Sequence, residues 1–252
     1  MDTKNGDRPG LGERIRDTRT LCLHMARQKR YFRVNEPVHA TARGGNRTAI
    51  FRHGFDKRKY LQRFALVAEQ EKVEIHGYCI MDNHVHWLLV PTTENGLARL
   101  FLRVHTWWAQ YFNKLADRSG HLFQSRFHSC LLDSAHYFAA MRYIDLNPKA
   151  AGVVPDPANF EFSSARAHLT GKPDPFLVLM MANWRHRFSN DPKRYREFLQ
   201  ESPREEQERL EKALRSGFPI GSDDWIARLE QESHRRLRPA PPGRPRHKSL
   251  AA

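Results

Sequence analysis

The chain has 252 residues, with 42 Lys and Arg against 28 Asp and Glu, which gives a formal net charge of +14. A chain of this length can bury one good core, with room for a small second unit. The charge indicates a polyanionic partner. Nucleic acid is the leading candidate because basic residues are interleaved with aromatic ones. The longest apolar run, residues 176–182, is too short to span a bilayer, so no membrane partner is expected.

The sequence contains neither a signal peptide nor a C-x-x-C motif, and both absences bear on the cellular compartment. The first thirty residues are polar and contain no apolar stretch typical of a signal peptide. The three cysteines, Cys22, Cys79 and Cys130, form no C-x-x-C motif. This excludes a cysteine zinc site and a disulfide framework, and it fits a reducing compartment. We therefore expect a cytoplasmic protein.

Residues 1–34 are charged and irregular, with Gly and Pro near the start, and they predict an N-terminal extension. Met25 opens the segment Met-Ala-Arg-Gln-Lys-Arg, which reads as a second possible start. Residues 1–24 are therefore predicted to be dispensable for folding and activity.

Residues 35–176 contain alternating strand and helix signals that predict one domain. In chain order the signals predict a strand at Val38–Arg43, a helix around Tyr60–Val67, strands at Val73–Met81 and His84–Pro91, a helix at Leu97–Leu115, a strand at Leu122–Leu132 and a helix at Ser134–Leu146. The pair Asn147-Pro148 is expected to end the last helix, because proline cannot continue a helix without losing a hydrogen bond.

The first six of these elements follow the order β-α-β-β-α-β, which predicts an α+β, ferredoxin-like (RRM-like) fold. Such a fold has an antiparallel four-stranded sheet with helices on one face. The other face of the sheet is expected to be free for a ligand. The third strand is central in this topology, and it carries His84 and His86.

After residue 176 the character of the sequence changes. Residues 177–232 predict a helical C-terminal extension, in which residues 201–216 form a mixed-charge helix exposed to solvent. Residues 233–252 contain six Lys and Arg, four Pro and no acidic residue. They predict a basic tail that is disordered when free.

His84 and His86 stand two positions apart in a predicted strand, so their side chains point to the same face, roughly 7 Å apart. Two imidazoles placed in this way can share one metal ion. The alternative is that one is a satisfied core histidine and the other is solvated.

Tyr143 and Asn147 are four positions apart in the predicted third helix and share a face. Tyr137, Met141 and Ile144 form another face, which is predicted to pack into the core. A tyrosine hydroxyl facing a metal held by two histidines is a candidate nucleophile, since the metal activates the phosphate that the phenol attacks. The Asn147 carbonyl oxygen suits Mg²⁺ or Mn²⁺. The alternative is a surface tyrosine followed by an asparagine that ends the helix.

Six short motifs follow one another between residues 25 and 176. They are Arg43-Gly-Gly-Asn-Arg47, His84-Val-His86, Gly120-His-Leu-Phe-Gln-Ser-Arg-Phe127, Arg142-Tyr-Ile-Asp-Leu-Asn-Pro148, Ala151-Gly-Val-Val154 and Phe162-Ser-Ser164. In this order and spacing they resemble the HUH single-tyrosine (IS200-like) transposases, and within these the REP-associated tyrosine transposases.

The resemblance implies a metal-dependent transposase/nuclease that cleaves and rejoins single-stranded DNA near hairpins. Tyr143 would attack a phosphodiester and form a 5′-phosphotyrosine. His84 and His86 would hold Mg²⁺ or Mn²⁺, and Asn147 stands where the family places a third, amide-type ligand.

The resemblance also implies DNA contacts by five residues, for which solvated surface charge is the alternative. They are Arg43, Asn46, Arg47, Gln124 and Arg126. The implied partner is single-stranded DNA with hairpins, bound by a nucleoid-associated monomer or homodimer.

Two other functions stay open from the sequence. A non-catalytic single-stranded nucleic-acid-binding protein of RRM-like fold needs the basic surface, but it does not need two histidines facing a tyrosine. A metal-dependent phosphohydrolase with water as nucleophile usually recruits several carboxylates. Asp82, Asp133 and Asp145 are not predicted to share the face of the histidines.

Overall fold

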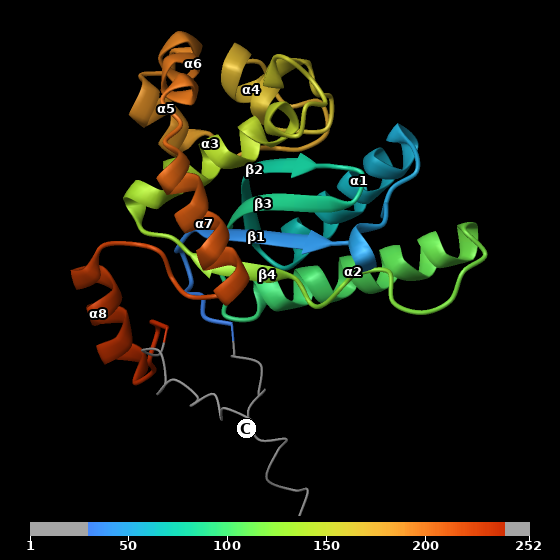
Figure 1. Cartoon of the computed structure of the whole chain (residues 1–252), viewed down its shortest axis with the longest axis horizontal. Coiled ribbons are helices and arrows are strands. Elements are labelled where there is room, and N and C mark those ends of the chain that lie inside the picture. The colour runs from blue at the N-terminus through green and yellow to red at the C-terminus, as the bar shows by residue number, and fades with distance from the viewer. Residues whose placement is uncertain (1–29, 240–252) are drawn as a thin grey trace, which may run out of the picture.

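The structure is a computed structural model, and it describes residues 30–239 (Figure 1). The predicted dispensability of residues 1–24 lies outside the described residues, and so does the predicted disorder of residues 240–252. The elements in chain order are β1 (Val38–Arg43), the 3₁₀ turn η2 (Gly45–Arg47), α1 (Gly54–Gln70), β2 (Val73–Ile80), β3 (His84–Pro91), α2 (Gly96–Leu115), β4 (His128–Leu131), α3 (Ser134–Ala150), η3 (Pro157–Asn159), α4 (Ala165–Thr170), α5 (Ala182–Phe188), α6 (Pro192–Gln200), α7 (Arg204–Ser216) and α8 (Asp223–Ser233).

The four strands form one antiparallel sheet in the order β2-β3-β1-β4. This order confirms the predicted ferredoxin-like topology, with β3 inside the sheet. The turn between β2 and β3 is tight: the Met81 amide donates to the His84 carbonyl at 2.9 Å, which leaves Asp82 and Asn83 as the turn residues. The tight turn sets the register that faces His84 and His86 away from Trp87.

β4 is shorter than predicted, because residues 122–127 form a loop and not a strand. The alternation of apolar residues in this loop has another cause. Phe123 stacks on His105 at 4.1 Å between ring centroids, and Phe127 stacks on Phe101 at 4.0 Å. Both rings therefore pack against α2, and the apolar alternation of this segment does not require a strand.

One face of the sheet packs against α1 and α2 and forms the core. Trp87 of β3 is fully buried and stacks on Phe64 of α1, with 3.5 Å between ring centroids. Val85 and Leu89 are buried on the same face, as their alternation with the histidines predicts. Burying one side chain of this size stabilises the fold by about 2 kcal/mol, so this face anchors the strand that carries the histidines.

The expectation that the opposite face is free is wrong, because α3 lies over β2 and β3 while α7 lies over β1 and β4 (Figure 1). Met141 and Ile144 of α3 are buried. Leu210 and Leu214 of α7 are also buried, although the charge pattern of residues 201–216 predicts a helix exposed to solvent. Two apolar residues four positions apart are enough to hold one face of this charged helix on the sheet.

Helix α3 continues through Pro148 to Ala150, so the prediction that it ends at Asn147-Pro148 is wrong. Pro148 stands in the last turn, where its missing N–H removes a single helix bond. The Ala151 amide still donates to the Asn147 carbonyl at 3.0 Å. Asn147 is therefore a helical residue, and it keeps its place one turn after Tyr143.

The C-terminal elements flank the sheet: α4, α5 and α6 gather beside β2, and α8 lies beyond β4 (Figure 1). Within the predicted tail, Leu237 is buried and its amide donates to Glu230 of α8 at 2.7 Å. Between residues 30 and 239, none of the helices has the length and apolarity that a bilayer crossing requires.

Candidate active site

His84, His86 and Tyr143 meet beneath α3. The rings of His84 and His86 lie 5.0 Å apart between centroids and stand nearly perpendicular, at 89°. The ring of Tyr143 lies 5.5 Å from that of His86. The strand alternation of β3 and the helical repeat of α3 therefore bring two imidazoles and a phenol to one place, as the sequence predicts.

A neighbouring polar atom lies within hydrogen-bond distance of the Nδ1 atom of each histidine. His84 Nδ1 lies 2.6 Å from Oδ1 of Asn83, and His86 Nδ1 lies 3.1 Å from Nε2 of His39. A proton on each Nδ1 satisfies both contacts. This tautomer leaves the lone pair of each Nε2 for a metal ion, which is the arrangement that outer partners of metal-binding histidines commonly impose.

Asn147 supplies an oxygen beside this pair. Its Oδ1 is buried, and within residues 30–239 it has no well-formed hydrogen bond. The amide faces His84, and this contact opposes the lowering of the His84 pKa. A buried carbonyl oxygen that lacks a well-formed hydrogen bond is costly, and coordination of a hard cation would satisfy it.

The donor set fits a divalent cation with one amide and two imidazole ligands. Over residues 30–239 no cluster of three or more His, Cys, Asp and Glu side chains could hold a metal ion. A cation at this site would therefore take three protein ligands from His84, His86 and Asn147, with water or substrate oxygens completing its shell.

Burial keeps the imidazoles neutral. It lowers the pKa of His84 to about 4, and the charge of Arg43 acts in the same direction. Burial also holds the pKa of His86 well below its usual value, with further lowering by His39, His84 and Arg43. Metal ligation requires deprotonated imidazoles, so the site is in the required protonation state at neutral pH.

Tyr143 is half-buried, and its pKa is raised to about 12. Burial is the main cause, and the charge of Glu211 and a hydrogen bond to its carboxylate raise the pKa further. Arg43 and Arg215 act in the opposite direction. Two of these three charged residues, Glu211 and Arg215, belong to α7, so the C-terminal extension forms one wall of the site.

Three residues near the site, His39, Glu211 and Arg215, are missed by the sequence analysis. His39 is fully buried on β1, with its ring 5.2 Å from His86 and 5.6 Å from Tyr143. The sequence offers one indication of its place: His39 and Arg43 are four positions apart in the predicted strand and therefore lie on the same face. Its contact with His86 depends on the pairing of β1 with β3.

The five predicted DNA-binding residues fall into two groups. The first group lies at the turn after β1. Arg43 is exposed and pairs across the sheet with His84. Asn46 and Arg47 follow in the left-handed backbone region, with φ of 50° and 59°. The Arg47 carbonyl accepts a hydrogen bond from Asn83 at 3.2 Å, so this turn contacts the residue that orients His84.

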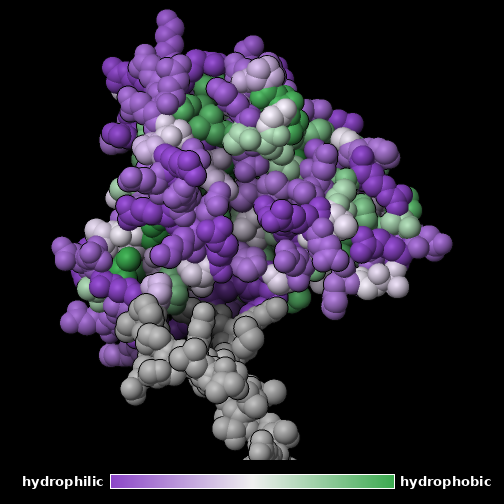
Figure 2. Space-filling view, in the orientation of Figure 1, coloured by the Kyte–Doolittle hydropathy of each residue, from purple (hydrophilic) through white to green (hydrophobic). Residues whose placement is uncertain are grey.

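The second group, Gln124 and Arg126, lines a cavity of about 380 Å³ at the start of β4. Figure 2 shows that the face carrying α7 is mainly hydrophilic. Both groups are accessible beside the histidines, which is compatible with the predicted contacts to DNA.

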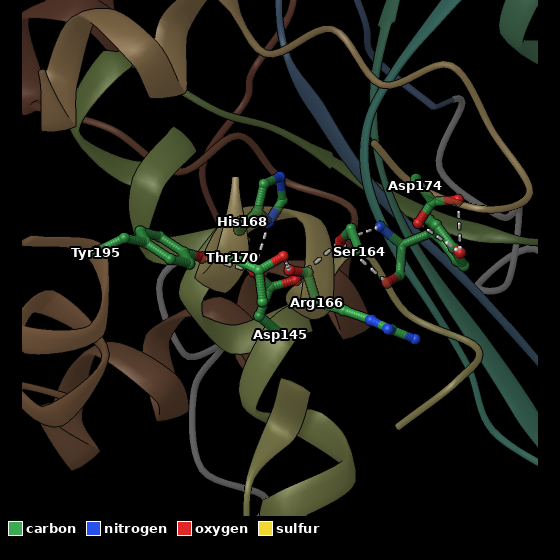
Figure 3. A network of polar contacts seen from close by, with 8 residues as sticks. Asp145, Ser164, Arg166, His168, Thr170, Asp174 and Tyr195 are labelled. Carbon is green, nitrogen blue, oxygen red and sulfur yellow. Dashed lines mark hydrogen bonds and ion pairs between the residues drawn. The ribbon is translucent and has the colours of Figure 1, made fainter. Parts of the chain in front are cut away.

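A buried network anchors α3 two residues beyond Tyr143 (Figure 3). The Asp145 carboxylate accepts hydrogen bonds from Ser164 at 2.8 Å, His168 at 2.6 Å and Tyr195 at 2.7 Å. All four side chains are buried. The network joins α3 to the start of α4 and to α6, and it therefore fixes the helix that carries Tyr143 and Asn147.

Two comparisons with known proteins give matches, one by sequence and one by structure. Residues 34–147 match the sequence model of the family described as IS200-like transposases. A solved structure of a REP-associated tyrosine transposase bound to a REP hairpin is 16% identical, with a TM-score of 0.48, and the match covers 57% of this chain and 85% of that chain. No curated protein matches this chain.

Proposed function

We propose that this chain, whose residues 34–147 match the IS200-like transposase family model, cleaves and rejoins single-stranded DNA near hairpins through a 5′-phosphotyrosine intermediate. One observation supports this mechanism above the others. The Tyr143 ring lies 5.5 Å from the His86 ring, and that ring lies 5.0 Å from His84. A nucleophile beside two potential metal ligands is an arrangement that a purely structural or binding role does not need.

Tyr143 would attack the scissile phosphorus, and the bond from phosphorus to the 3′ oxygen would break. One phosphodiester replaces another, so the step needs no nucleotide cofactor and is reversible. The phenol is protonated at neutral pH, because its pKa is about 12. The Glu211 carboxylate, which hydrogen-bonds to the phenol, is positioned to accept this proton, and the leaving 3′ oxygen takes a proton from solvent.

His84, His86 and Asn147 would hold Mg²⁺ or Mn²⁺. When bound, such an ion would polarise the scissile phosphate and neutralise developing charge. His39 and Asn83 would keep the two imidazoles in the ligating tautomer through their contacts at 3.1 Å and 2.6 Å.

The net charge of +14 supports binding to a nucleic acid. Arg43, Asn46 and Arg47 would contact DNA beside His84, and Gln124 and Arg126 would contact it at the start of β4. The family resemblance motivates the assignment of hairpins as the target.

Two alternatives make different products. A non-catalytic binder would leave the DNA intact. A hydrolase would release two free ends. The Asp145 carboxylate accepts hydrogen bonds within its buried network, and the Asp133 carboxylate contacts His136. Neither carboxylate is therefore available beside His84 and His86.

The decisive test is incubation of the full chain with Mn²⁺ and hairpin-bearing single strands that are labelled at either end. We expect a denaturation-resistant adduct with the downstream fragment, linked through its 5′ phosphate, and a free 3′-OH on the upstream fragment. Peptide mapping by mass spectrometry should place the adduct on Tyr143. Two free DNA ends without attached protein would favour the hydrolase.

A further inference from the structure

A basic cavity lies next to the candidate active site, between the C-terminal end of α7 and the start of β4. It has a volume of about 380 Å³. The described residues that line it include the guanidinium groups of Arg30, Arg126 and Arg215 and the imidazole of His128, and they include no carboxylate. The cavity therefore favours an anionic ligand.

The sheet register places this cavity close to the histidines. His128 pairs with Thr41 across β1 and β4, and Thr41 pairs with His86 across β1 and β3. Directly paired residues point to the same face, and neighbouring strands are separated by about 4.8 Å. His128 therefore lies about 10 Å from His86 on the same face.

Helix α7 joins the cavity to the nucleophile. Arg215 lines the cavity, and Glu211, one helical turn earlier, hydrogen-bonds to Tyr143. Arg215 forms a long contact of 3.4 Å with Glu211, and its side chain is 72% exposed. An exposed pair with this geometry contributes little stability, so Arg215 can exchange this contact for a stronger anionic partner.

The ligand class follows from the groups that are available. Phe127 also lines the cavity, but its ring stacks on Phe101 and is covered by Arg30, with 3.7 Å between the guanidinium carbon and the ring centroid. It therefore offers no open platform for a nucleobase. Guanidinium groups bind phosphate oxygens in a bidentate manner.

We propose that this cavity binds one backbone phosphate of the DNA strand that flanks the scissile phosphate, with Arg215 and Arg126 as its principal ligands. The proposal rests on the proposed function, because it takes the DNA strand at Tyr143 as its reference. It assigns substrate positioning to α7, a helix of the C-terminal extension beyond the matched residues 34–147. The strand would then be held on both sides of the bond to be cut.

The test is a scan of single-stranded substrates in which each phosphate near the cleavage site, and each phosphate in the hairpin stem, is replaced in turn by a neutral methylphosphonate. Binding by the full chain is measured by fluorescence anisotropy for the wild type, Arg215→Gln, Arg215→Lys and Arg209→Gln. Arg209 is an exposed residue of the same helix that does not line the cavity, so its variant controls for the loss of one positive charge. Circular dichroism checks that each variant is folded.

We expect one flanking position at which neutralisation weakens wild-type binding about 10-fold or more, as for a charge-assisted hydrogen bond. Arg215→Gln should lose this sensitivity at that position alone. Arg215→Lys should keep part of it, since lysine retains the charge without the fork geometry. Arg209→Gln should retain the full wild-type pattern.

Two results would overturn the proposal. One is that no flanking position loses its sensitivity in Arg215→Gln, and the other is that Arg215→Gln and Arg209→Gln both lose sensitivity at every position. A position in the hairpin stem whose sensitivity is lost in Arg215→Gln would also contradict it, because the cavity would then bind duplex phosphate. If the wild type forms the adduct but shows none of the expected pattern, the proposed function stands and the phosphate site fails. If no adduct forms and no single strand binds, the proposed function itself fails.

Discussion

The proposed cleavage requires the hydroxyl of Tyr143 as its nucleophile. Tyr143→Phe keeps the ring contacts with His39 and His86, so folding and DNA affinity should change little. Cleavage should fall by at least about 10³-fold, because no positioned nucleophile replaces the phenol. Denaturing gels should show no adduct.

Tyr137→Phe is the matched control on the same helix. Its hydroxyl contacts His76 at 2.9 Å, so the variant should lose about 1 kcal/mol of stability and still form the adduct. An adduct that persists in Tyr143→Phe would refute the assignment of the nucleophile.

His84 and His86 are expected to bind the metal together. His84→Ala or His86→Ala removes one of two imidazole ligands, so Mn²⁺ affinity measured by calorimetry should fall and cleavage should be lost. Hairpin binding should largely remain, because the DNA-contacting groups are untouched. His121→Ala, at an exposed position, is the control. Undiminished cleavage in EDTA would dispose of the metal requirement.

His39 should act through His86 and not on the DNA. His39→Leu removes the Nε2 atom that lies 3.1 Å from His86 Nδ1, and loss of such an outer partner weakens metal affinity about 10–100-fold. His39→Gln places an amide oxygen near the lost Nε2 and should restore much of the affinity. Calorimetry with Mn²⁺ on the DNA-free protein measures both variants. Equal affinities for Leu and Gln would show that His39 has no orienting role.

At the scale of elements, helix α6 holds α3 in place through Tyr195 and Asp145. Tyr195→Phe removes a 2.7 Å hydrogen bond to a buried carboxylate. The free energy of unfolding should fall by about 1–3 kcal/mol, measured by urea denaturation at unchanged m-value. Tyr111→Phe, at a half-buried position of α2, should cost less than about 0.5 kcal/mol.

The same denaturation experiment tests how the extension relates to the domain. Arg142 of α3 donates to the Phe198 carbonyl at 3.1 Å and pairs with Glu206, in addition to the contact between Asp145 and Tyr195. We therefore expect residues 177–232 to unfold with residues 35–176 in one cooperative transition. Two separate transitions would show that the extension is an independent unit.

At the scale of the whole molecule, the buried histidines should make stability depend on pH. Burial lowers the pKa of His39 to about 3 and that of His86 well below 6.5. Below pH 6.5 the unfolded chain therefore binds protons that the folded chain does not. As the pH falls from 6 to 4, His39 should lower the free energy of unfolding by about 1.4 kcal/mol per pH unit, and His86 should act in the same direction.

Urea denaturation without divalent cations, at several values of pH, measures this slope. His39→Gln should remove the contribution of one histidine, and His121→Gln, at an exposed position, controls for the loss of a histidine. A slope that is the same in the wild type and His39→Gln would mean that His39 does not stay neutral in the folded protein.

The features that depend on local chain geometry can be predicted from the amino-acid sequence alone. Alternation in a strand places His84 and His86 on one face, and the helical repeat places Tyr143 and Asn147 one turn apart. The order of the strands and helices was sufficient to predict the topology, because short connections and antiparallel pairing leave few arrangements.

The distant residues that join them are brought there by packing between strands and helices. His39 reaches His86 through strand pairing, and Glu211 and Arg215 reach the site because Leu210 and Leu214 hold α7 on the sheet. The apolar alternation of residues 122–127 is satisfied by α2 and not by a longer strand. Such contacts depend on packing free energy summed over the whole core, and a pattern confined to one segment does not contain that information.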